Sequence, residues 1–229
     1  MKKKRNFYEQ NSNLMNELLC RATERGDLSL IKILVNRGAD VNYNSKINLT
    51  PLMIAAKNGH IDVIDYLIEQ HVNVSYRNIS GTSAILMAIF GEHIDAVDRL
   101  LATQEYDINI EDNLMNTPIF FATMSGRLDI MNRLITYGAN YHHTNKFNKT
   151  ILHYASEFCN IDMIKYVLSL GINVNFQDKY GDTSLIIACK NGRSKVAMIL
   201  LEHNADINIL NNYGKSSYDY MNKQMREFI

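Results

Sequence analysis

Apolar and polar positions along the chain follow a pattern that repeats every 33 or 34 residues. Within one period, an apolar stretch around a small residue is followed by a turn. Apolar pairs three to four residues apart come next, as in Val63, Ile64, Leu67 and Ile68. Such spacing is typical of an amphipathic helix. Each period therefore predicts two short helices joined by a tight turn.

A Thr or Ser marks the start of each period, and we call it the anchor. The anchors, at steps of 33, 34, 33, 33 and 33 residues, are Thr50, Ser83, Thr117, Thr150, Thr183 and Ser216. Stepping back 33 residues from Thr50 reaches Glu17, where Leu19 and Ala22 keep the pattern. A Thr or Ser hydroxyl can cap a helix, and the Pro that follows two anchors needs no amide hydrogen bond there. The first helix of each period is therefore expected directly after its anchor.

The glycines keep the same register. All but one of the 11 fall nine residues after an anchor, 21 after it or two before it, and Gly91 is out of register by one residue. Glycine at these positions permits the left-handed backbone of sharp turns and helix ends. Turn-forming residues, namely Asn78, Asp112, Asp178 and Asn211, precede four anchors by five residues. They suit a tight hairpin-like turn between successive periods.

This pattern resembles the ankyrin repeat, a unit of about 33 residues with a Thr-Pro-Leu-His-x-Ala motif near its start. Thr150–Ala155 carries the Thr, Leu, His and Ala of that motif, and Thr50–Ala55 carries the Thr, Pro, Leu and Ala. The resemblance covers residues 14–229. It departs at the motif His, which most units replace with Met53, Leu86, Phe120 or Ile186. That change removes a polar contact between repeats but not the fold.

The resemblance implies an all-α fold, an ankyrin-repeat solenoid of helix-turn-helix units joined by hairpin-like turns. We expect a polar, basic N-terminal tail at residues 1–13 and a single ankyrin-repeat domain at residues 14–229. The six expected units and the C-terminal half-repeat cap span residues 14–44, 45–77, 78–111, 112–144, 145–177, 178–210 and 211–229. The cap is expected to hold one helix, from Tyr218 to Phe228. Polar end units keep such a stack soluble.

The amino-acid composition disfavours some classes of function and some cell compartments. Lys and Arg total 24, as do Asp and Glu, so the formal charge is zero, which disfavours binding to nucleic acid or an anionic membrane. Three widely spaced cysteines favour a reducing compartment over a disulfide framework. We expect a cytoplasmic monomer. The alternatives are secretion into a host cell cytosol and, because of the basic run Lys2–Arg5, the nucleus.

The repeat explains each motif that suggests chemistry. Gly214–Ser216 resembles the end of a phosphate-binding loop, but the first glycine of that loop is missing. Cys159, His153 and Asp162 could form a nucleophile, base and acid, yet Cys159 replaces an inter-helix glycine and His153 is the motif His. His142–His143 lacks further ligands at metal spacing. The sequence therefore predicts no enzyme, cofactor or metal site.

Proteins of this family typically bind partners along a concave surface made of the turn tips and the exposed side of the first helices. In this sequence an aromatic line with neighbouring lysines occupies those positions. The candidate partner-binding residues are Leu49, Lys57, Phe90, Met124, Phe147, Phe158, Tyr180, Lys190 and Tyr213. Large apolar patches are uncommon on soluble monomers, and aromatic anchors suit protein interfaces. We expect a non-enzymatic scaffold or adaptor that binds an extended or helical peptide with apolar anchors and some acidic residues.

Other interpretations stay open at this point. Some of the rings could fold back onto neighbouring units and belong to the core, with Phe90 and Phe147 the first candidates. One alternative is a bacterial ankyrin effector that acts on a eukaryotic host protein, since ankyrin-like repeats are frequent among such proteins. The richness in Asn, Ile, Lys and Met indicates an AT-rich genome, which fits several intracellular bacteria and also some protists. An enzyme, or a nucleic-acid binder that uses the lysines of the concave side, is less favoured.

Overall fold

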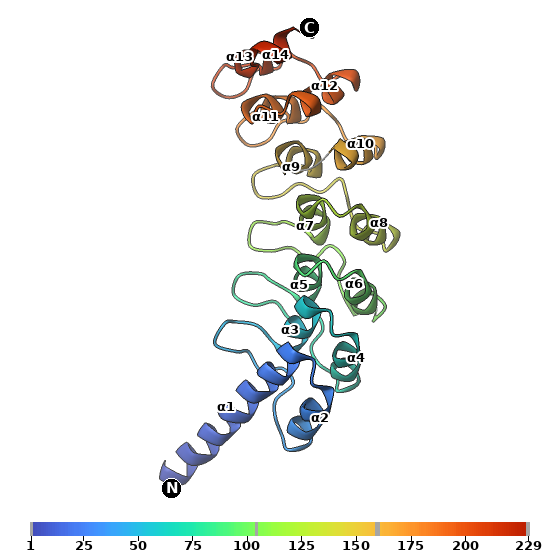
Figure 1. The fold of residues 1–229 in the computed structure, drawn as a ribbon. Helices are drawn as coiled ribbons and strands as arrows, with labels where there is room; N and C mark the ends of the chain where they lie inside the picture. The colour runs from blue at the N-terminus through green and yellow to red at the C-terminus, as the bar shows by residue number, and fades with distance from the viewer. Residues whose placement is uncertain (1, 104, 159–160, 228–229) are drawn as a thin grey trace. The chain divides into compact units, whose positions relative to one another are not determined.

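A computed structural model describes residues 2–103, 105–158 and 161–227. These residues form fourteen α-helices and no β-strand. The chain divides into two compact units, Met1–Ile110 (unit 1) and Glu111–Ile229 (unit 2) (Figure 1). None of the described helices is both long and apolar enough to cross a membrane.

Unit 1 stacks three helix pairs. Its helices are α1 (Lys2–Arg25), α2 (Leu28–Asn36), α3 (Pro51–Asn58), α4 (Ile61–Glu69), α5 (Ala84–Phe90) and α6 (Ile94–Leu101). The first helices of the pairs form one layer, in which α3 packs against both α1 and α5 (Figure 1). The second helices form the other layer, in which α4 packs against α6.

Unit 2 repeats this arrangement. Its helices are α7 (Pro118–Ser125), α8 (Leu128–Thr136), α9 (Ile151–Phe158), α10 (Ile161–Ser169), α11 (Ser184–Lys190), α12 (Ser194–Glu202), α13 (Ser217–Tyr220) and α14 (Lys223–Arg226). In the first layer α7, α9, α11 and α13 pack in succession, and in the second α12 packs against α10 and α14. The loops before the first helices extend away from the second layer (Figure 1).

The first helices begin where the anchors predict. The Thr50 hydroxyl accepts a hydrogen bond from the Met53 amide at 3.3 Å, and Pro51 is the first residue of α3. The Thr150 hydroxyl instead lies 2.8 Å from Nδ1 of His153. Thr183 caps α11 as Thr50 caps α3, through the Ile186 amide at 3.3 Å, whereas Ser83 and Thr117 form no side-chain cap bond. The helices after all six anchors therefore start at the expected residue, but the anchor hydroxyl caps only some of them.

Two repeat positions on each first helix supply the core. The apolar residue two positions after the anchor is at most 1% exposed in six repeats: Leu19, Leu52, Ile85, Ile119, Leu152 and Leu185. The residue five after the anchor is an alanine in the same six repeats, at most 2% exposed: Ala22, Ala55, Ala88, Ala122, Ala155 and Ala188. Because alanine has only a methyl group, neighbouring helices can approach closely at this position. Burial of these two positions holds the helix pairs together within unit 1 and within unit 2.

The two ends of the chain differ from the simplest expectation. The backbone of residues 2–13, expected as a tail, is helical and continuous with α1. At the other end, the expectation of one helix from Tyr218 to Phe228 was wrong, because the cap holds two short helices. Met221 has an extended backbone between them, and the Asn222 side chain starts α14 by accepting from the Met225 amide at 2.9 Å. Phe228 lies outside the described residues, as does Gln104, near the extra residue of the 34-residue step.

The irregular register of Gly91 has a steric cause. Gly91 has an ordinary helical φ of −79°, and the left-handed φ of 59° falls on Glu92. Gly59, nine residues after its own anchor as Glu92 is, has a φ of 69°. A Cβ atom on Gly91 would lie 2.2 Å from the carbonyl oxygen of Lys57. Glycine is therefore needed here for close approach to the neighbouring helix, not for the turn.

Candidate protein-binding surface

A side chain closes the loop in front of each first helix of unit 2. The Asn145 side-chain oxygen accepts from the amides of Phe147 at 2.9 Å and Lys149 at 3.1 Å. Asp178 bonds the amides of Tyr180 and Asp182 in the same way, at 2.8 and 3.0 Å. Asp178, an expected turn-former, and Asn145 at the same repeat position thus hold the loop backbone, and the residues that they bond form a tip.

Backbone hydrogen bonds join successive tips of unit 2. The three amide-to-carbonyl bonds are Lys146 to Leu114 at 2.9 Å, Lys179 to Phe147 at 2.8 Å, and Asn212 to Tyr180 at 3.0 Å. The tips therefore form one continuous edge. We call the surface made by the tips and the exposed side of the first helices the tip face of each unit.

An open groove lies on the tip face of unit 2. It has a volume of about 290 Å³, and its apolar lining residues are Met124, Phe147, Tyr154, Phe158 and Tyr180. We call this set the aromatic groove. Met124, Phe158 and Tyr180 are 40%, 54% and 44% exposed, and Phe147 is half-buried. Four of the nine residues predicted to bind a partner therefore come together in one site.

Tyr154 belongs to the groove but was absent from the sequence prediction. Its ring meets Phe120 edge-to-face at a centroid distance of 5.4 Å and lies 6.1 Å from the ring of Phe158. Its hydroxyl accepts from the Asn145 side-chain amide at 2.9 Å, and partial burial raises the pKa of the phenol. Tyr154 and Phe158 stand four residues apart on one helix, a spacing that could have revealed the pair.

The charges beside the groove neutralise each other. Lys149 pairs with Glu157 at 2.9 Å, and Lys190 pairs with Asp182 at 2.5 Å. The two pairs occupy the same repeat positions, one before and seven after the anchor, with opposite polarity. Lys190, predicted to face a partner, also lies over the Tyr220 ring at 4.9 Å. Its charge is therefore partly satisfied within the chain.

Two further predicted residues do not line the groove. Tyr213, on the last tip of unit 2, is 69% exposed. Phe90, at the end of α5 in unit 1, is 53% exposed, although it was one of the two rings expected to fold back first.

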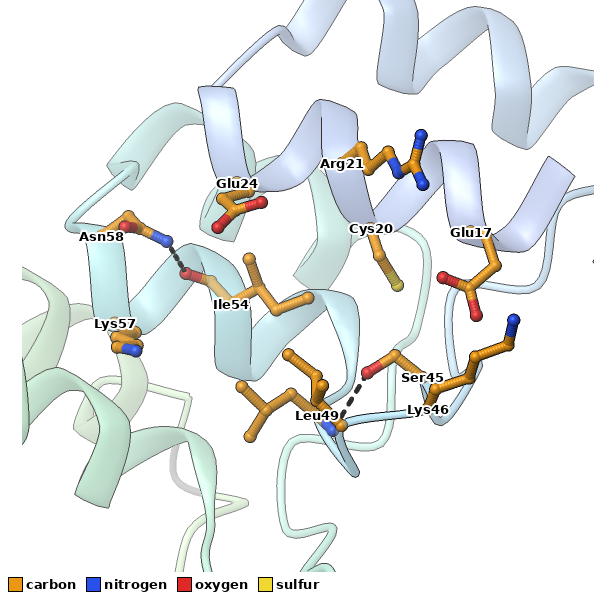
Figure 2. Close-up of a pocket in the computed structure, with 11 residues that line it drawn as sticks. Glu17, Cys20, Arg21, Glu24, Ser45, Lys46, Leu49, Ile54, Lys57 and Asn58 are labelled. Carbon is orange, nitrogen blue, oxygen red and sulfur yellow. Dashed lines mark hydrogen bonds between the residues drawn. The ribbon is translucent and has the colours of Figure 1, made fainter. Parts of the chain in front are cut away.

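Unit 1 has a different pocket on its tip face, of about 210 Å³, shown in Figure 2. The buried side chains of Cys20 and Ile54 line it together with the predicted residue Leu49. Around them stand charged residues of both signs: Glu17, Arg21, Glu24, Lys46 and the predicted Lys57. This pocket combines a small apolar base with a mixed-charge rim.

His153, considered as a catalytic base, has a structural role. His153 is fully buried, which lowers its pKa to about 4. Its Nδ1 accepts from the Thr150 amide at 3.1 Å, and its Nε2 donates to the Asp182 carbonyl of the next repeat at 3.2 Å. This is the inter-repeat contact expected of the motif His. Cys159 lies outside the described residues.

The described thiols are buried. Burial raises the pKa of Cys20 to about 12, with a smaller effect of Glu17, and raises that of Cys189 to about 11. Both thiols therefore stay protonated at neutral pH, where a thiol is a poor nucleophile.

The remaining motifs lie in the repeat framework. Gly214 is in the last tip, and Ser216 caps α13. His143 Nε2 lies 3.0 Å from the Met115 carbonyl oxygen, while His142 is exposed. Within the described ranges, no three His, Cys, Asp or Glu side chains are placed to hold a metal ion.

Paired helices in two layers, with a tip loop between successive pairs, define a helical repeat protein. A family model described as ankyrin repeats (three copies) matches residues 19–112 and 119–211, so the chain belongs to the ankyrin-repeat family. It is similar to the crystal structure of the human ASB11 ankyrin repeat domain, with 24% identity and a TM-score of 0.79 over 90% of this chain and 92% of that one. That likeness shows the fold. No curated protein matches the sequence. Ankyrin repeats are typically protein–protein interaction modules.

Proposed function

We propose that this chain is a non-enzymatic scaffold or adaptor that binds a partner protein on its tip face, with the aromatic groove as the main contact site. One observation carries the proposal: residues from three successive repeats, Met124 to Tyr180, gather around one open groove. None of the chain's described residues covers their apolar surface, so it stays in contact with water. Exposed aromatic clusters of this kind are typical of protein-binding sites.

The rigidity of the groove supports the same function. Phe147 and Tyr180 stand on tips whose backbones are held by Asn145 and Asp178 and by bonds to neighbouring tips. Tyr154 is held by its ring contacts and its hydroxyl. A backbone that is already held in position loses little conformational entropy on binding, which favours affinity.

The test is a pull-down from cell lysate with wild type and a Phe158→Glu/Tyr180→Glu variant, read by mass spectrometry. A matched control is Tyr137→Glu/Tyr218→Glu, which adds the same charge at two exposed rings outside the groove. We expect a protein that is lost with the groove variant and kept with the control. If both variants retain the wild-type partners while circular dichroism shows native helix content, the groove is not the binding site.

We also propose that the chain works in the reducing environment of the cytoplasm. The support is that Cys20 and Cys189 are free thiols packed into the core. Fractionation of cells that express the chain would test this location, and recovery from the medium or an oxidising compartment would contradict it.

A further inference from the structure

Two tips of unit 2 carry a lysine followed directly by an aromatic residue: Lys146–Phe147 and Lys179–Tyr180. The two side chains of each tip serve different surfaces. Phe147 and Tyr180 line the aromatic groove. Lys146 and Lys179 are exposed and do not line it. A partner in the groove would therefore meet apolar surface inside it and positive charge along its border.

No described carboxylate compensates the border charge. Lys149 and Lys190 are paired with carboxylates, but among the described residues neither Lys146 nor Lys179 has a carboxylate within ion-pair distance. The two positions of the tip that the lysine and the aromatic residue occupy, four and three before each anchor, carry no Asp or Glu in any repeat. Charge complementarity therefore favours acidic residues in the segment that binds here.

The spacing of the tips restricts the conformation of that segment. Phe147 and Tyr180 lie one repeat apart, and the first helices of these repeats, α9 and α11, pack directly together. Packed helices have axes about 8–10 Å apart, so equivalent groups on the two tips recur at about this distance. In a polyproline II segment every third residue points the same way, at intervals of about 9.3 Å. A β-strand presents one side about every 6.6 Å, which does not match.

The size and lining of the groove agree with this conformation. A volume of about 290 Å³ is at the small end for ligand sites and suits one or two side chains better than the body of a helix. Polyproline II segments typically dock onto grooves lined by aromatic rings.

We propose that the aromatic groove binds an acidic, extended segment of the partner in polyproline II conformation. An apolar residue at every third position enters the groove, and Asp or Glu beside it pairs with Lys146 and Lys179. This rests on the proposed function and specifies the partner segment.

The test uses a synthetic fluorescent peptide of four Pro-Leu-Glu triplets and the full chain, with binding followed by fluorescence anisotropy. Two comparison peptides are used. The first has the same composition with irregular leucine spacing, and the second has lysine in place of every glutamate. We expect the regular acidic peptide to bind most tightly. Equal binding of either comparison peptide, tighter binding of a helical peptide with leucine every seventh residue, or no binding of the regular peptide would overturn the inference.

Charge reversal locates the contact. Lys146→Glu/Lys179→Glu should weaken binding of the acidic peptide about tenfold at low salt and less at high salt, because exposed charges are screened. The matched control is Lys165→Glu/Lys195→Glu, which makes the same charge change at exposed residues of the second layer, on α10 and α12. Equal affinity of both variants would refute the role of the tip lysines. If Phe158→Glu/Tyr180→Glu loses a cellular partner while the acidic peptide fails to bind, the proposed function stands and only this inference falls.

Discussion

The pocket of unit 1 and the aromatic groove of unit 2 use the same repeat positions with different chemistry. Ile54 in the pocket corresponds to Tyr154 in the groove, and Lys57 corresponds to Glu157. Both sites lie where a tip meets the first helices. One has a small apolar base with charges of both signs, and the other has a ring-lined surface with its charges paired. The repeat thus fixes where a site forms, and a few positions free of packing decide what it recognises.

The largest effect is expected where this comparison is broken at the groove itself. Phe158→Glu/Tyr180→Glu should reduce affinity for a groove-bound partner by about 1,000-fold, since aromatic hot spots contribute about 2 kcal/mol each and about 1.4 kcal/mol corresponds to a factor of ten. Lys57→Glu, a charge change in the unit 1 pocket, should leave that affinity nearly unchanged. Isothermal titration calorimetry with the purified partner measures both values. A larger loss from Lys57→Glu would move the main site to unit 1.

A smaller effect, on the pH dependence of stability, is expected at the motif His. In unit 2 this residue is His153, which is buried, whereas Leu86 holds the same repeat position in unit 1. The pKa of His153 is about 4 in the folded chain, below the ordinary value. The unfolded chain therefore takes up a proton first as the pH falls from about 6.5 to 4, which lowers the free energy of unfolding by on the order of 3 kcal/mol.

His153→Leu removes this titrating group and should flatten that pH dependence. Amide hydrogen exchange of α9 and α11, at neutral pH and near pH 4.5, reports it for unit 2. The variant is expected to be less stable at neutral pH, because it loses the bonds to Thr150 and Asp182. Only the change with pH decides the question. An unchanged slope in the variant would assign the acid sensitivity to other groups.

The smallest effect is expected at the tips. Met115 has a left-handed φ of 60°, whereas Gly81 holds the same repeat position in unit 1 with a φ of 76°. Met115→Gly should raise the free energy of unfolding by about 0.5–1 kcal/mol, because relief of backbone strain exceeds the added flexibility of the unfolded chain. Asn148→Gly, at φ 55°, should gain less, since Asn tolerates this conformation. Urea unfolding at neutral pH compares the two, and destabilisation by Met115→Gly would exclude strain there.

Much of the fold could be predicted from the sequence because its rules are local. Anchors cap helices, glycine permits left-handed turns, and apolar spacing identifies the buried side, so Thr50, Pro51 and Leu52 alone mark a helix start and a core position. The split of the cap at Met221 could not be foreseen in this way. A regular apolar and polar pattern runs across it, and only its backbone conformation reveals the break.

The site was predictable in part for a related reason. Repeat register was enough to select Met124, Phe158 and Tyr180 for the tip face. Two features were missed: Lys190 forms an ion pair with Asp182, and the Tyr154 side chain lines the groove. Both depend on which side chains contact one another within a repeat or between neighbouring repeats. Register gives the positions but not these pairings, which follow from side-chain geometry.

The closed tips have a consequence for how such a protein can change over evolutionary time. Asn145 and Asp178 bond the amides of the tip, and every residue other than proline keeps its amide N–H whatever its side chain. Residues such as Lys146 and Tyr180 can therefore be replaced with little effect on folding. Selection for a new partner and selection for a stable chain then act on separate residues, so recognition can diverge quickly while the scaffold is inherited intact.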